Sequence, residues 1–148
     1  MRSLTLTEIE LAVRGAFDAD TCDPDDLPGW HPANASRGQS AAAALVVNDL
    51  LGGDLVFADV MVDGIRTGGH WWNLFGVVEV DITRDQYSPE EIVVGGTVVT
   101  RPAGPPTRGL AQYELLRRRT FERLGLLPAP VVPEPVPTGL PPPDPILD

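Results

Sequence analysis

The sequence has little cysteine, little histidine and few basic residues, and each shortage argues against a class of protein. Cys22 is the single cysteine, which excludes an internal disulfide and a multi-thiolate metal site. The two histidines lie at unlike sites, so we expect no structural zinc. Eleven basic residues against 21 acidic ones give a formal net charge of -10. Nucleic acids and anionic membranes require a basic patch, so we expect neither as a partner.

Long apolar runs are also missing. The N-terminal residues lack the apolar core of a signal peptide, and no run is long enough to span a bilayer. We therefore expect a cytoplasmic protein. Gly68-Gly69 and Gly95-Gly96 are not followed by Gly-Lys, so they do not form a phosphate-binding loop, and we expect no cofactor and no metal.

The chain of 148 residues has the length of one domain and can bury a core. We expect a single α+β domain over residues 1–127. From Pro128 onward prolines are too dense for a helix or a central strand. Residues 128–148 are therefore expected to form a Pro-rich, disordered tail.

The rest of the chain is organised around a predicted buried helix in residues 38–53. Its apolar residues recur with the i, i+3, i+4, i+7 spacing of an amphipathic helix, and Gly52-Gly53 supplies the stop. Ser40 lies at the N-terminal end of the inward-facing stripe, where free N–H groups and the helix dipole favour negative charge. A nucleophile can use that environment, and so can an ordinary N-cap.

Two further helices and several strands are expected from periodicity and turn residues. The helices run from about Thr7 to Phe17 and from about Leu110 to Leu124. The strands are residues 56–62, a hairpin of 69–75 with 78–82, and short strands on either side of Gly95-Gly96.

The predicted hairpin brings His70 and Asp81 together. If its turn is centred on Phe75-Gly76, the two residues face each other directly, with Cβ atoms roughly 4.5 to 5.5 Å apart. A slip of one residue would place His70 opposite Val80 and turn Asp81 to the other face. With the predicted register, the carboxylate orients the imidazole and leaves its second nitrogen for a nucleophile's proton.

Ser40, His70 and Asp81 together resemble the arrangement of papain-like and transglutaminase-like thiol hydrolases. More closely, four stretches resemble the small bacterial YunG-like proteins: Trp30 with Asn34, residues 38–53, residues 70–73 and residues 79–87. The resemblance implies a compact papain-like α+β domain, with the nucleophile-position helix buried against a small antiparallel sheet. It also implies catalytic roles for Ser40, His70 and Asp81.

The chain departs from the family pattern at Ser40, where a cysteine is often found. A serine hydroxyl stays protonated and needs a base in the transition state, whereas a cysteine beside histidine can exist as a thiolate. Three interpretations stay open. Ser40 attacks an amide or ester in a hydrolase or acyltransferase; the chain is an inactive pseudoenzyme that binds a small-molecule, peptide or protein ligand; or a cysteine has been replaced by serine.

The predicted site has further members, each with a structural alternative. Gln39 could supply an N–H to an oxyanion hole, and Trp72 and Asn73 could line the cleft. Equally, Trp72 could belong to the core, Asn73 could hydrogen-bond at a strand edge, and His70 could be a satisfied core histidine. Cys22 is a poor nucleophile, because the aspartates around it raise the pKa of its thiol.

Overall fold

The computed structural model describes residues 3–127, so the predicted tail lies outside the described residues. The described part is mixed α+β, with three α-helices, three 3-10 turns and four strands. The helices are α1 (Leu6–Gly15), α2 (Ser40–Leu51) and α3 (Leu110–Arg123), and the 3-10 turns are η1 (Ala19–Thr21), η2 (Leu27–Gly29) and η3 (Arg84–Gln86). The strands are β1 (Asp54–Val62), β2 (Ile65–Phe75), β3 (Val78–Val80) and β4 (Ile92–Val99). Within residues 3–127, none of the helices has the length and apolar character needed to cross a membrane.

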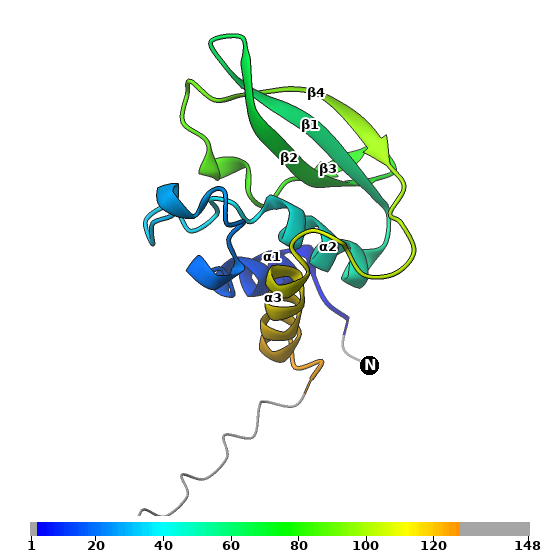
Figure 1. Cartoon of the computed structure of the whole chain (residues 1–148). Coiled ribbons are helices and arrows are strands. Elements are labelled where there is room, and N and C mark those ends of the chain that lie inside the picture. The colour runs from blue at the N-terminus through cyan, green and yellow to red at the C-terminus, as the bar shows by residue number, and fades with distance from the viewer. Residues whose placement is uncertain (1–2, 128–148) are drawn as a thin grey trace, which may run out of the picture.

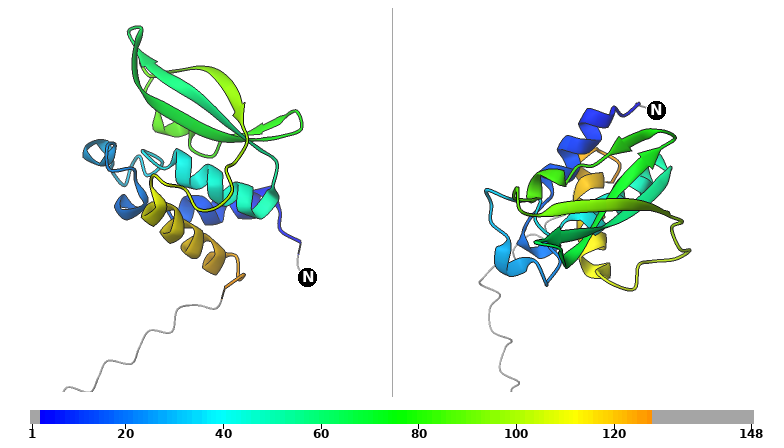
Figure 2. Two further views of the ribbon diagram at one scale, coloured as in Figure 1. Left: turned by 45° about the vertical axis from the view of Figure 1, so that its right-hand side comes forward. Right: turned by 90° about the horizontal axis from the view of Figure 1, so that it is seen from above.

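The α2 helix lies in the middle of the molecule, between the sheet and the other two helices (Figures 1 and 2). Val46 and Val47 are fully buried and share a core with Ile9 of α1 and Leu116 of α3. On its other side, α2 accepts a hydrogen bond at the Ala44 carbonyl from the amide of a β2 residue, at 2.9 Å. The predicted packing of a buried helix against a small antiparallel sheet is therefore present.

The sheet is antiparallel throughout, with strand order β3-β2-β1-β4. Asp63 and Gly64 both have positive φ, 50° and 75°, and form the turn between β1 and β2. Tight hairpins favour such residues because their turns must match the strand twist.

The predicted register of the β2–β3 hairpin is wrong by one residue at the turn. Asn73 pairs with Val80 and Phe75 with Val78, so the turn residues are Gly76-Val77 and not Phe75-Gly76. Direct pairing of His70 with Asp81 is therefore excluded, and Asp81 lies just beyond the end of β3. When the centre of the turn moves by one residue, the residue opposite each β2 position changes by two. Because side chains alternate between the faces with a period of two, every side chain stays on the predicted face.

Adjacent side chains of β2 pack on opposite faces of the sheet. The amide of Asn73 reaches α2, whereas Trp72 packs with Val56 and Ala58 in a second, smaller core. His70, two residues from Trp72, lies on the same face as Trp72 and its ring stacks on the indole at a centroid distance of 5.5 Å. His70 therefore lies against this smaller core.

Candidate functional site

His70 and Asp81 are in contact despite the change of register. Nε2 of His70 lies 2.7 Å from Oδ2 of Asp81, and the imidazole is fully buried. Asp81 also accepts hydrogen bonds from Nε of Arg84 at 2.7 Å and from the main-chain N–H of Thr83 at 3.3 Å. Because Asp81 follows the end of β3, its carboxylate reaches the ring diagonally and not from a directly opposite position.

The second nitrogen of His70 is hydrogen-bonded to Tyr87, a residue that was not predicted from the sequence. Nδ1 lies 3.0 Å from the hydroxyl of Tyr87, whose ring meets the imidazole edge-on at 5.0 Å. Burial, reinforced by nearby carboxylates, raises the pKa of Tyr87, so its hydroxyl keeps its proton. In the tautomer whose Nε2–H donates a hydrogen bond to Asp81, Nδ1 accepts a hydrogen bond from the Tyr87 hydroxyl.

Ser40 is the first residue of α2, and the N-cap position belongs to Gln39. The Ser40 hydroxyl accepts a hydrogen bond from the main-chain N–H of Trp71 at 3.3 Å, which ties the start of α2 to β2. The structure thus brings Ser40 next to the residue that follows His70. Among the described residues, however, the ring bonds to Asp81 and Tyr87, and no hydrogen bond joins Ser40 to His70.

A cavity of about 760 Å³ opens beside Ser40. Its wall is formed by the first turn of α2, the β1–β2 hairpin, Tyr87 and residues 101–109, which connect β4 to α3. Phe57 and Trp71 contribute aromatic surface, with ring centroids 4.8 Å apart. We call this cavity the Ser40 cleft.

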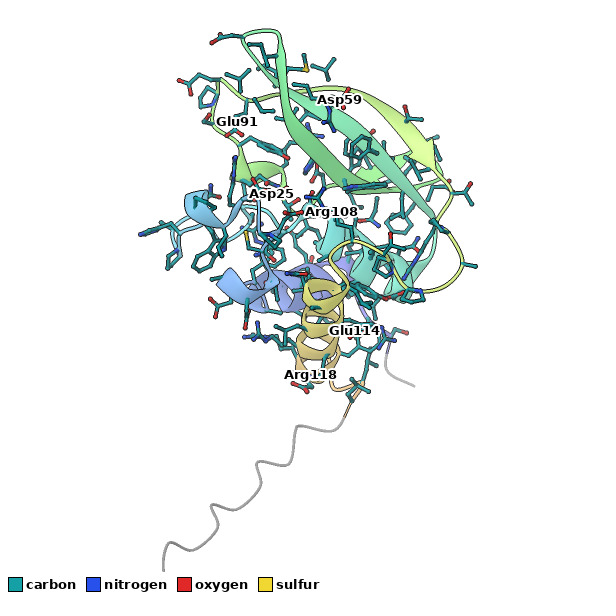
Figure 3. All side chains as sticks on the ribbon, viewed as in Figure 1. Asp25, Asp59, Glu91, Arg108, Glu114 and Arg118 are labelled. Carbon is teal, nitrogen blue, oxygen red and sulfur yellow. The ribbon has the colours of Figure 1, made fainter. Side chains whose placement is uncertain are left out.

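Charged residues of both signs border the Ser40 cleft. Arg37 donates to both carboxylate oxygens of Glu91, at 2.9 and 2.8 Å. Burial opposes ionisation of Glu91, but the bonds from Arg37 and Ser88 outweigh it and lower the pKa of Glu91. Arg108 pairs with Asp25 at 2.7 Å, and Figure 3 shows these two side chains side by side.

Comparison with known proteins identifies the family of this chain. The family model described as YunG protein matches residues 5–125, which include all three helices and all four strands. The chain belongs to the YunG family. No curated protein and no solved structure matches it.

In this member of the YunG family, the other three predicted site residues are directed away from the Ser40 cleft. Gln39 donates its side-chain N–H to the Asp18 carbonyl at 3.0 Å and its main-chain N–H to the Ser36 carbonyl at 3.1 Å. Trp72 is buried in the smaller core, and Asn73 bonds to α2. Trp72 therefore belongs to the core, whereas the hydrogen bond of Asn73 runs to α2 and not along a strand edge, because β1 and β3 flank Asn73 on both sides.

Cys22 is buried in this family member, as a residue of the acidic segment before α2. Burial, with help from Asp26 and Asp23, raises the pKa of its thiol to about 11. The predicted rise in the pKa of the Cys22 thiol is confirmed, although burial and not the aspartates is its largest cause. Within residues 3–127, no cluster of three or more His, Cys, Asp or Glu side chains could hold a metal ion.

Proposed function

We propose that this chain is a binding module with a papain-like arrangement, whose Ser40 cleft holds a ligand without cleaving it. The observation that carries the proposal is the engagement of both nitrogens of His70, one by Asp81 and one by Tyr87. A general base needs a nitrogen that can accept the nucleophile's proton. In His70 that nitrogen, Nδ1, is already occupied by a hydrogen bond from the Tyr87 hydroxyl, which keeps its own proton.

The chemistry of residue 40 supports the same conclusion. A thiol beside an available histidine at a helix N-terminus can ionise, whereas a serine hydroxyl there stays protonated and depends entirely on a base. The Ser40 oxygen instead accepts the N–H of Trp71 and connects α2 to the sheet. The order of the nucleophile-position helix, the histidine strand and the aspartate supports the papain-like arrangement, which on this proposal serves as a scaffold.

The size and lining of the Ser40 cleft suit a ligand. Its volume of about 760 Å³ lies within the range of roughly 300 to 1,000 Å³ that is typical of ligand sites. Aromatic surface from Phe57 and Trp71 lies near polar groups of Ser40 and Arg37. Such a mixture provides apolar contact area together with a few groups that can orient a ligand.

The test compares wild type with Ser40→Ala. Both proteins are treated with a fluorophosphonate probe and with p-nitrophenyl acetate, and a serine esterase serves as the positive control for the reagents. We expect equal labelling and equal hydrolysis, because Ser40 has no base. Hydrolysis by wild type that falls to background in Ser40→Ala would show that the binding-only proposal is wrong.

A second candidate function is an amide or ester hydrolase or acyltransferase, and the 2.7 Å contact between His70 and Asp81 favours it. In this mechanism Ser40 attacks the carbonyl, His70 takes its proton and Asp81 orients the ring. The Tyr87 hydroxyl would first have to leave Nδ1. The test is therefore Tyr87→Phe, which frees that nitrogen: hydrolysis that appears in this variant and disappears in Tyr87→Phe/Ser40→Ala would favour the hydrolase.

A further inference from the structure

One edge of β2 is largely unpaired and borders the Ser40 cleft. β2 has 11 residues, and β1 pairs on one side with residues 65–74, apart from an irregularity at Thr67. On the other side β3 has 3 residues and pairs only with Asn73 to Phe75. From Ile65 to Trp72, this second edge has no strand partner within the part of the chain that the structure describes.

The alternation of an antiparallel sheet identifies the groups that point outward from this edge. The N–H of Trp71 bonds to Ser40 and so points away from β1. Gly69, two residues along the same strand, presents its N–H and C=O in the same direction. The free outward groups are therefore the N–H and C=O of Gly69 and the C=O of Trp71.

The cavity gives these groups access to a ligand. Gly68, Gly69 and Trp71 all line the Ser40 cleft. A Cβ atom at Gly68 would have no heavy atom within 4 Å, so a side chain at this point of the cleft wall would enter open space. The aromatic rings of Phe57 and Trp71 lie beside the same stretch and offer apolar surface to an incoming side chain.

We propose that the occupant of the Ser40 cleft is an extended polypeptide segment that adds to β2 as a strand at Gly69 and Trp71. The inference rests on the proposed function and names its ligand class. Donors and acceptors that repeat every two residues match a second polypeptide, which carries the same repeat. Because Ser40 already takes the N–H of Trp71, the added strand stops there, and one of its apolar side chains packs on Phe57 and Trp71.

The experiment selects binders from a phage-displayed library of random octapeptides on the full chain and then synthesises them with a single N-methyl group at each position in turn. We expect N-methylation to weaken binding at least tenfold at alternate residues of a short stretch and to leave the intervening residues nearly unchanged. Hydrogen exchange at the Gly69 amide should slow when the unmethylated peptide binds.

Two variants locate the binding. Gly68→Leu places a side chain in the cleft wall, where the backbone has room for it, and should weaken binding at least tenfold. Val94→Thr is the matched control, because Val94 is 51% exposed on β4, the other edge strand of the sheet, and should leave the affinity unchanged. Slowed exchange along β4 with an unchanged Gly69 amide would overturn the proposal.

The outcomes separate this inference from the proposed function. If Gly68→Leu weakens binding but N-methylation shows no alternating pattern, strand addition is overturned and the proposal of a ligand-binding cleft stands. The same holds if the library yields no binder while small molecules bind the cleft. Ser40-dependent cleavage of a peptide that shows the alternating pattern overturns the binding-only function and supports strand addition.

Discussion

The Tyr87→Phe variant tests the hydrogen bond on which the interpretation of the site depends. The substitution removes one oxygen and keeps the aromatic ring, so the edge-on contact with the imidazole at 5.0 Å is retained. What is lost is the donor to Nδ1 of His70, 3.0 Å away. His70 is fully buried, so the variant leaves Nδ1 without a donor from the protein.

A buried acceptor left without a partner costs about 1 to 3 kcal/mol. For a domain of this size, each kcal/mol changes Tm by about 4 °C. Tyr87→Phe is therefore expected to lower the free energy of unfolding by about 1 to 3 kcal/mol and Tm by about 4 to 12 °C. Urea denaturation and calorimetry measure the two quantities independently.

Tyr113→Phe is the matched control, because the chain has only two tyrosines and both hydroxyls are bonded. The Tyr113 hydroxyl donates to Asp49 and accepts from Arg101, but these partners also pair with each other at 2.6 Å and stay satisfied without it. Its loss should be below about 1 kcal/mol. Equal losses in the two variants would refute the assignment of Tyr87 as the required partner of His70.

Three other predictions follow from local geometry. Gly38→Ala should destabilise the fold by more than Gly109→Ala. Both glycines have φ of 71°, but only at Gly38 would a Cβ overlap neighbouring side chains. Urea denaturation of the two variants measures the difference. An arginine of α1 bonds to Asp85 and lowers its pKa, so charged Asp85 stabilises the fold at neutral pH and that contribution fades as the pH falls below about 4. Asp85→Asn should therefore be less stable at neutral pH and should show a shallower loss of stability in acid. Ser40→Cys should react with iodoacetamide no faster than an ordinary thiol near neutral pH, because no free nitrogen of His70 promotes its ionisation, and a much faster reaction would contradict this.

The central helix and the first three strands followed from periodicity and turn residues. The hairpin register did not, because the prediction placed the turn on Phe75-Gly76. Gly76 has φ of 62° and is the first turn residue, a position that favours glycine in two-residue hairpins. Giving Gly76 that position would have predicted the observed register.

The wrong placement of Trp72 and Asn73 in the cleft and the omission of Tyr87 have different origins. Trp72 and Asn73 are adjacent in a strand and point to opposite faces, so strand geometry already forbade their lining one cleft from the same face. No such rule predicts the position of Tyr87, because it follows η3, outside the hairpin. Its approach to His70 depends on how the segment after β3 turns back toward β2. Only the resemblance of residues 79–87 to the family pattern pointed to this segment.

The most direct test is the nitrogen NMR spectrum of the His70 imidazole, with His31, an exposed histidine outside the site, as internal reference. The spectrum is recorded for wild type, Ser40→Ala and Tyr87→Phe near neutral pH. The hydrogen bonds described here predict a protonated Nε2 and an unprotonated, accepting Nδ1, whose resonance moves in Tyr87→Phe and stays in place in Ser40→Ala. A resonance of Nδ1 that moves in Ser40→Ala and stays in place in Tyr87→Phe would show that Ser40 is the partner of His70, and would contradict the binding-only account.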